Sequence, residues 1–139
     1  MTAISPEDRQ LVQAAVEARA NAYAPHSGFM VGAALLTNDG KVYTGCNVES
    51  DAYSPTICAE RVALGSAIAA GEKPGSFKAV AVVCGSRPCS PCGVCRQLLF
   101  ELGGPDLRVI MASAPDGEDT IVWTAGELLP LGFRLKDFE

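Results

Sequence analysis

Three cysteines constrain the fold of this chain more than any other feature of its sequence. Cys92 and Cys95 are separated by two residues, and Cys58 stands well before them. Each group opens a segment of helical composition, where unpaired amide N–H groups and the helix dipole favour a thiolate. If the two helices pack side by side, three thiolates converge on one point. Three protein ligands with an open fourth position are typical of a catalytic rather than a structural zinc site.

Glu60 follows Cys58 by two residues, so its carboxylate can reach that open position from the same helical turn without binding the metal. A catalytic zinc needs such a neighbour to take a proton from bound water and return it to a leaving group. Arg61 and Arg96 directly follow Glu60 and Cys95, and can offset the thiolate charge by hydrogen-bonding the sulfur atoms. These residues therefore indicate hydrolytic zinc chemistry.

The cysteines also allow other interpretations. Cys-x-x-Cys alone occurs in redox pairs, and this alternative stays open at the level of the motif. An iron–sulfur ligand run that started at Cys89 would need a further cysteine at position 99, which is Leu99, so the sequence excludes it. Cys46 and Cys84 lie in apolar segments and are expected to be small core residues, while Cys89 has no assigned role. His26, the only histidine, is expected to be a solvated or hydrogen-bonded loop residue.

Composition limits the class of protein. With 139 residues, 48% of them hydrophobic, the chain is expected to form a single domain over 1–139. The net charge of −5 argues against binding to nucleic acid or to an anionic membrane surface. No stretch resembles a bilayer span or a secretion signal, so we expect a cytoplasmic protein. In that reducing compartment, cysteines are expected to bind metal or to catalyse rather than to form disulfides.

Hydrophobic patterning and capping signals predict an α/β fold. Helices are expected over 6–23, 58–70, 92–102 and 124–129, and strands over 31–36, 42–46, 79–84, 107–111 and 120–123. The Asn38-Asp39-Gly40 turn predicts a hairpin between the first two strands. This order predicts a three-layer α/β/α sandwich around a mixed five-stranded sheet.

Longer motifs resemble the small zinc-dependent cytidine deaminases. The matching segments are Thr-Ile-Cys-Ala-Glu-Arg at 56–61, Ser-Pro-Cys-Gly-Val-Cys-Arg-Gln at 90–97, Tyr-Ala-Pro-His-Ser-Gly-Phe at 23–29, Val-Gly-Ala-Ala at 31–34, Thr-Gly-Cys-Asn-Val-Glu at 44–49 and Glu-Leu-Leu-Pro at 127–130. Together they span nearly the whole chain in the family's order.

The resemblance implies a reaction and a cofactor. Cys58, Cys92 and Cys95 would bind one zinc ion per chain, and Glu60 would be the proton shuttle. Zinc-bound hydroxide would attack C4 of the cytosine ring, and ammonia would leave. The implied activity is deamination of cytidine and 2′-deoxycytidine to uridine and 2′-deoxyuridine in pyrimidine salvage.

The resemblance also implies how the nucleoside is held. Asn47 and Glu49 would hold the ribose hydroxyls, and residues two apart on an extended segment do face the same way. Phe29 would pack on the base, and the backbone N–H of Ala59 would contact it. Phe133 would come from a neighbouring subunit, since the family is typically homotetrameric with sites completed across interfaces.

Two alternatives remain. Residues 50–55, Ser-Asp-Ala-Tyr-Ser-Pro, depart from the family pattern near the expected sugar pocket. A deaminase acting on a cytosine-containing antibiotic, as blasticidin S deaminases do, would share the zinc motifs, although Arg61 and the Asn47-Val48-Glu49 triplet favour cytidine. A non-catalytic zinc-binding scaffold would need no Glu60, and a fourth ligand such as Cys89 would support it.

Overall fold

A mixed five-stranded sheet in the order β2-β1-β3-β4-β5 forms the centre of the molecule in the computed structural model, which describes residues 2–139. The strands are β1 (Gly32–Thr37), β2 (Val42–Cys46), β3 (Phe77–Val83), β4 (Arg108–Ala112) and β5 (Thr120–Thr124). The helices are α1 (Pro6–Arg19), α2 (Ala59–Ala69), α3 (Gly93–Gly103), α4 (Ala125–Leu128) and the 3₁₀ helix η1 (Leu135–Phe138). β3 and β4 pair in parallel, and the other neighbours are antiparallel.

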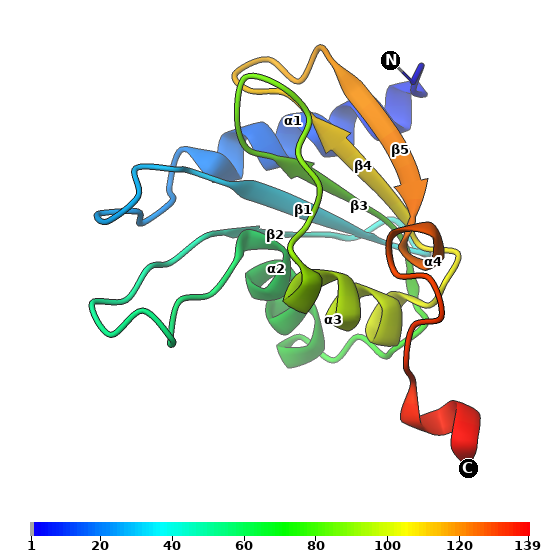
Figure 1. Ribbon diagram of the computed structural model, residues 1–139. Coiled ribbons are helices and arrows are strands. Elements are labelled where there is room, and N and C mark those ends of the chain that lie inside the picture. Colours follow the sequence, from blue (N-terminus) through cyan, green and yellow to red (C-terminus); the bar gives the residue numbers. More distant parts are fainter. Residues whose placement is uncertain (1) are drawn as a thin grey trace.

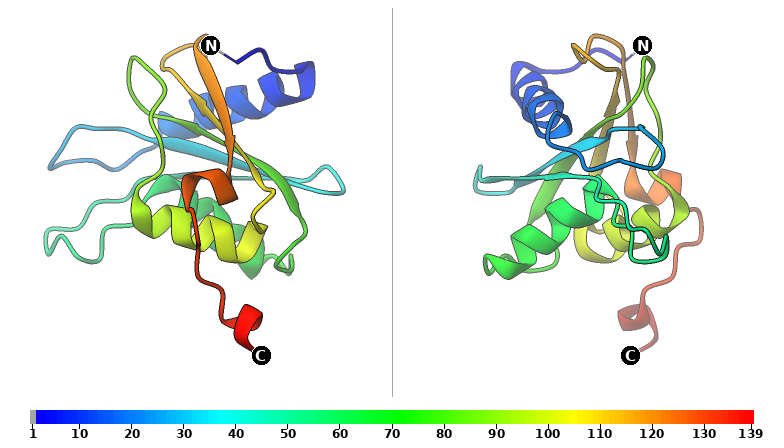
Figure 2. Two further views of the ribbon diagram at one scale, coloured as in Figure 1. Left: turned by 45° about the vertical axis from the view of Figure 1, so that its right-hand side comes forward. Right: turned by 90° about the vertical axis from the view of Figure 1, so that its left-hand side faces the viewer.

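Helices cover both faces of the sheet. α1 lies on one face, while α2 and α3 lie side by side on the other (Figures 1 and 2). Each face has its own apolar core, one centred on Leu11 and Ile110 and the other on Leu64 and Leu99. The three-layer α/β/α prediction is therefore confirmed. Among the described residues, every helix is too short or too polar to cross a membrane.

The first helix is shorter than the sequence predicted, since α1 ends at Arg19 rather than near Tyr23. Beyond it the Tyr23 N–H donates to the Asn47 carbonyl at 2.9 Å, and the Glu49 N–H donates to the Tyr23 carbonyl at 2.9 Å. The segment after α1 thus pairs with the chain leaving β2 instead of continuing the helix. The remaining predicted elements agree with the structure to within about two residues, and η1 was not predicted.

Two glycines let the helices lie directly on the sheet. A Cβ atom at Gly32 would lie 2.0 Å from the Ala15 carbonyl oxygen in α1, and one at Gly45 would lie 2.4 Å from the Ala59 carbonyl oxygen in α2. No larger residue fits at either position without displacing backbone. Gly45 therefore fixes how closely the start of α2 approaches β2.

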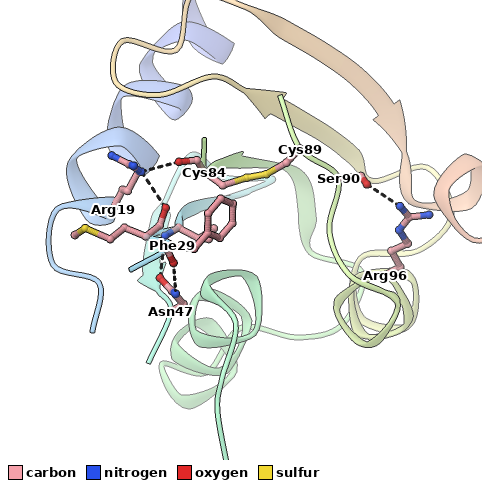
Figure 3. The surroundings of a disulfide bond; sticks show 9 residues. Arg19, Phe29, Asn47, Cys84, Cys89, Ser90 and Arg96 are labelled. Atoms are coloured by element: carbon pink, nitrogen blue, oxygen red, sulfur yellow. Dashed lines mark hydrogen bonds between the residues drawn. A yellow bond between two sulfur atoms is a disulfide. The ribbon is translucent and has the colours of Figure 1, made fainter. Parts of the chain in front are cut away.

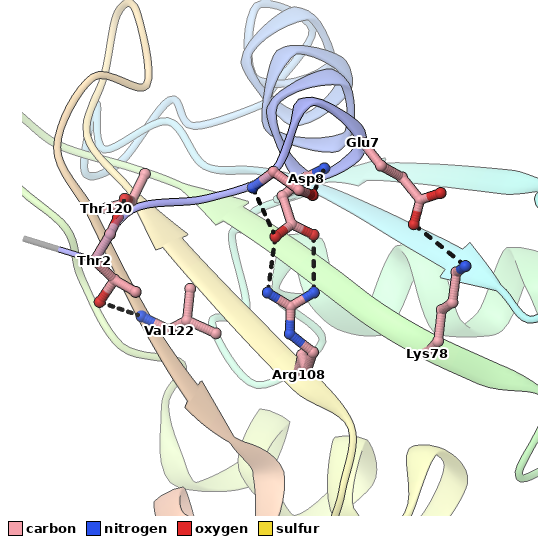
Figure 4. A network of polar contacts seen from close by, with 8 residues as sticks. Thr2, Glu7, Asp8, Lys78, Arg108, Thr120 and Val122 are labelled. Atoms are coloured by element: carbon pink, nitrogen blue, oxygen red, sulfur yellow. Dashed lines mark hydrogen bonds and ion pairs between the residues drawn. The ribbon is translucent and has the colours of Figure 1, made fainter.

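An ion pair joins α1 to the sheet (Figure 4). The Arg108 guanidinium donates to both carboxylate oxygens of Asp8, with Nη1–Oδ1 at 2.8 Å and Nη2–Oδ2 at 2.7 Å. Asp8 is only 4% exposed and also forms a capping box with Ser5 at the start of α1. The hydrogen bonds from Arg108 lower the pKa of the Asp8 carboxyl below its usual value of 3.8.

Replacing Asp8 with asparagine is expected to lower the free energy of unfolding by about 2 kcal/mol at pH 7, because the charged hydrogen bonds to Arg108 are lost. A carboxyl with a depressed folded-state pKa stabilises the fold above its unfolded pKa and loses that effect as pH falls through the folded value. The difference between wild type and variant should therefore shrink below about pH 4. Urea unfolding at pH 7 and pH 3 measures both effects.

Glu7→Gln is the matched control for this prediction. Glu7 pairs with Lys78 at 3.2 Å, but both side chains are substantially exposed, so its removal should cost less than about 0.5 kcal/mol. If both substitutions lowered the free energy of unfolding equally at pH 7, the buried Asp8–Arg108 pair would stabilise the fold no more than the exposed Glu7–Lys78 pair.

Candidate active site

The three candidate zinc ligands lie at the beginnings of two neighbouring helices. Cys58 is the N-cap residue of α2 and Cys92 is the N-cap residue of α3, while Cys95 lies in the first turn of α3. Their sulfur atoms all lie within 4.8 Å of one another, and the Sγ atoms of Cys58 and Cys92 are 3.8 Å apart. The structure thus brings together the three thiols that the sequence singled out.

This arrangement fits a zinc ion. With Zn–S bonds of about 2.3 Å, two sulfurs in a tetrahedral shell lie about 3.8 Å apart, close to the observed Cys58–Cys92 distance. Cys95 is buried, whereas Cys92 is exposed at the opening of the site. In the described chain no fourth cysteine, histidine or carboxylate joins this group, which leaves one coordination position for water or substrate.

The surroundings of the Cys58 sulfur favour negative charge. Hydrogen bonds from the Cys95 thiol and from Arg61 lower the pKa of Cys58 to about 5. The pKa of Cys95 is raised, because its thiol proton is donated to Cys58 and because the residue is buried. Arg61 Nη2 lies 3.5 Å from the Cys58 sulfur, as expected from the sequence, and this contact raises the arginine pKa.

Arg96 does not reach a sulfur atom, contrary to the sequence-based expectation. Its guanidinium donates to the carbonyls of Pro91 and Leu128 at 2.7 and 3.0 Å, and to the Ser90 hydroxyl at 2.8 Å. The bonds to Ser90 and Pro91 hold the segment that precedes Cys92, and the bond to Leu128 ties it to α4. Arg96 therefore holds the ligand-bearing loop rather than the thiolates themselves.

Glu60 is buried in the lining of the cavity that also contains two of the thiols. It is 4% exposed and lines the same cavity as Cys58 and Cys92. Burial is the main cause that raises the pKa of this carboxyl above 4.5, and the nearby Cys58 charge adds to it. A carboxyl with a raised pKa next to a metal position is a candidate general acid and base.

The cavity in front of the thiols has a volume of about 290 Å³ and a mostly apolar lining with a few convergent polar groups, as is typical of small-molecule sites. Phe29 and Ala59, for which the resemblance implied contacts to the base, form part of its lining. Phe133 lies elsewhere: it is 54% exposed, stacks on Phe138 and does not line this cavity.

Asn47 and Glu49 both line the cavity, and both also hold backbone segments. The Asn47 amide accepts from the Val31 N–H at 2.8 Å and donates to the Phe29 carbonyl at 2.8 Å. The Glu49 carboxylate accepts from the N–H groups of His26 and Ser27 and from the Ser27 hydroxyl. The Ser27 hydroxyl is the main cause that lowers the pKa of Glu49. Each side chain keeps an unused hydrogen-bonding position for a ligand.

Residues 50–55, which depart from the family pattern, form a largely exposed loop that directly follows Glu49. The loop contacts the segment after α1 through His26, whose Nε2 lies 3.0 Å from Asp51 Oδ1. The expectation that His26 is a hydrogen-bonded loop residue is therefore confirmed.

A disulfide that the sequence did not predict lies in the cavity lining (Figure 3). Cys84, expected to be a free core residue, is buried but bonded to Cys89, so the expectation that no cysteines form disulfides is wrong for this pair. After β3 the chain reverses over residues 85–88 and brings the two Cα atoms to 6.5 Å, within the usual range for a disulfide. The turn-forming composition of Gly85, Ser86 and Pro88 between two cysteines was the available signal.

Comparison with known proteins identifies similar chains. Residues 5–112 match the family model for the cytidine and deoxycytidylate deaminase zinc-binding region. The chain is 45% identical to a cytidine deaminase of Sporosarcina psychrophila, with 92% of each chain covered. It is 32% identical to a blasticidin-S deaminase of Bacillus cereus, with 94% of each covered. The crystal structure of a cytidine deaminase from Burkholderia pseudomallei superposes with a TM-score of 0.87 at 51% identity, covering 94% of this chain and all of that one.

Proposed function

The chain belongs to the cytidine and deoxycytidylate deaminase family, and on this premise we propose that it hydrolyses cytidine and 2′-deoxycytidine to uridine and 2′-deoxyuridine plus ammonia. One observation carries the proposal: a buried carboxyl, Glu60, lies beside three converging thiols in a cavity with an apolar lining. A scaffold module would have no use for that carboxyl.

The proposed mechanism divides the chemistry between the metal and the chain. Cys58, Cys92 and Cys95 would hold one zinc ion, which supplies Lewis acidity and makes water nucleophilic at neutral pH. Glu60 accepts a proton from the attacking water and delivers it to the amino group that leaves C4 of the cytosine ring. Burial raises the pKa of this carboxyl above its usual value, which favours proton uptake. Arg61 donates to the Cys58 sulfur and offsets the thiolate charge.

We assign substrate binding to residues that line the same cavity as the thiols. Phe29 would pack on the pyrimidine, and the Ala59 N–H, in the first turn of α2 where amides have no intrahelical partner, would donate to it. Asn47 and Glu49 would contact the ribose hydroxyls through the positions that their backbone contacts leave unused.

The biological setting is proposed by analogy with the family. We assign the whole of 1–139 to one domain acting in pyrimidine salvage in the cytoplasm. A homotetramer is supported by the exposed apolar residues of the carboxyl-terminal segment, Leu131, Phe133, Leu135 and Phe138. In such an assembly Phe133 would complete the cavity of a neighbouring subunit.

Replacing Glu49 with glutamine is expected to raise KM for cytidine about 10–100-fold with little change in zinc content. The His26 and Ser27 N–H groups both donate to one carboxylate oxygen, and replacing the other oxygen with an amide nitrogen removes the charge and an acceptor for a ribose hydroxyl. Steady-state kinetics with parallel zinc analysis measures this effect. Glu127→Gln, which alters the carboxylate of the α4 capping box outside the cavity, is the matched control. An unchanged KM in the Glu49 variant would remove this residue from the substrate site.

The proposed function is tested by an ultraviolet assay of the zinc-quantified protein with cytidine, 2′-deoxycytidine and blasticidin S. Loss of cytidine absorbance at about one zinc per chain supports the proposal. Turnover of blasticidin S alone would favour the second candidate, for which the similarity to the Bacillus cereus enzyme is the supporting observation. Full zinc occupancy without turnover of any of the three contradicts both.

A further inference from the structure

We propose that the Cys84–Cys89 pair is a positioning element of the substrate cavity, and that its oxidation state sets the affinity for the nucleoside. The inference rests on the proposed function, because the cavity that the pair lines is the one assigned to the nucleoside. Both cysteines line this cavity together with Phe29, Glu60 and Cys92. Figure 3 shows the bonded pair and Phe29.

One end of the pair is held rigidly by the sheet. Cys84 follows the last residue of β3 and is 1% exposed. Its carbonyl accepts from Arg19 Nε at 2.9 Å, and the same nitrogen donates to the Met30 carbonyl at 2.9 Å. The next carbonyl, that of Gly85, accepts from the Ala114 N–H. Cys84 is therefore fixed with or without a bond to its partner.

The other end has less support. Cys89 is partly exposed and stands three residues before the ligand Cys92. Cys89 and Ser90 line the substrate cavity on one side and a second cavity of about 380 Å³, bordered by Trp123 and Met111, on the other. A segment that lies between two cavities makes few packing contacts with its neighbours. Besides the disulfide, the side chain of Arg96 holds this segment through its hydrogen bonds to Ser90 and Pro91.

The bond therefore ties a weakly packed part of the cavity wall to the end of β3. Phe29 packs against this region, since a Cβ atom at Gly85 would lie 3.6 Å from its Cε1 atom. Breaking the bond frees residues 86–90 to move relative to Phe29, whereas Glu60 and the first turn of α2 keep their own contacts. The expected consequence is weaker substrate binding with little change in the chemical step.

The bond can be exchanged with dithiols and disulfides in solution. A thiolate of a small dithiol attacks the more accessible Cys89 sulfur, the S–S bond breaks, and Cys84 leaves as a thiolate that takes up a proton. The second thiol of the reagent then releases Cys89 and carries away the disulfide, so that two electrons and two protons reach the protein. The reverse reaction transfers them to a small-molecule disulfide. Disulfides of this exchangeable kind are the ones expected in a reducing compartment.

The test uses the zinc-loaded enzyme equilibrated with either dithiothreitol or oxidised glutathione. Alkylation and mass spectrometry report whether positions 84 and 89 are bonded, zinc analysis reports metal content, and kinetics with cytidine gives KM and kcat. We expect KM to rise about 3–10-fold on reduction, with kcat within about twofold and zinc unchanged. The double variant Cys84→Ala/Cys89→Ser should have the high KM under both conditions.

Two comparisons keep the test specific. Cys46→Ser removes a free thiol of β2 that lies outside both cavities, and it should respond to the reagents as wild type does. If loss of the buried Cys84 side chain impairs folding of the double variant, Cys89→Ser replaces it in the test. This single variant should show the same high KM under both conditions. Thiols that stay alkylatable in oxidised glutathione, or equal KM values in the two states, would overturn the inference. An absence of turnover in both states would contradict the proposed function as well.

Discussion

Replacing Glu60 with glutamine is expected to lower kcat about 10²–10⁴-fold while the protein keeps its zinc. Glutamine has nearly the same shape and can still hydrogen-bond, but it cannot take a proton from water and pass it to the leaving amine. The three residues that could bind the metal are Cys58, Cys92 and Cys95, so the substitution of Glu60 leaves the metal site intact. Initial-rate kinetics and zinc analysis on the same sample measure both quantities.

The same substitution is expected to leave stability unchanged or to increase it. Burial raises the pKa of Glu60, which shows that the charged form is unfavourable where it lies, and a neutral amide avoids that cost. Glu17→Gln makes the same change at an exposed position of α1 and should alter neither rate nor stability. A Glu60→Gln enzyme with full activity would show that another group moves the proton.

Replacing Cys92 with serine is expected to weaken zinc binding by more than about 100-fold and to abolish turnover. Outer contacts of metal ligands alone are worth about 10–100-fold in affinity, and here a thiolate that binds the metal directly is lost. Cys92 is exposed, so its substitution leaves no buried cavity and any effect reports on the metal. Competition with a chromophoric chelator measures the affinity.

Cys46→Ser is the control for this substitution. Cys46 is a partly buried free cysteine of β2 and is not among the three converging thiols. Its variant should bind one zinc per chain with unchanged affinity. Retention of tight binding in Cys92→Ser would mean that a different residue completes the metal site.

Local patterns were sufficient to predict most of the fold and the cysteine cluster. The spacing of Cys92 and Cys95, and the polar residues before Cys58, mark two helix starts, and the structure places those starts side by side. The Asn38-Asp39-Gly40 turn predicted the β1–β2 pairing, because a hairpin turn is determined by a few neighbouring residues.

Features that depend on distant contacts were not predictable in the same way. α1 ends early because Tyr23 bonds to Asn47 and Glu49, which are remote in sequence. Arg96 turns to the carbonyl of Leu128 instead of a sulfur, and nothing near position 96 encodes that partner. The Cys84–Cys89 bond depends on how the chain turns over residues 85–88, and the spacing of the two cysteines does not specify that turn. Local propensity is a weak guide wherever tertiary contacts decide.

The two helices that carry the cysteines both begin without a side-chain hydrogen bond to their first amides, because a cysteine stands where serine, threonine or aspartate would normally do so. Such an omission typically costs a helix about 1 kcal/mol. A cation shared by both ends would compensate by drawing the two helix starts together. Metal occupancy and local order at these ends would then be linked, and we expect depletion of the ion to loosen the first turns of α2 and α3 together.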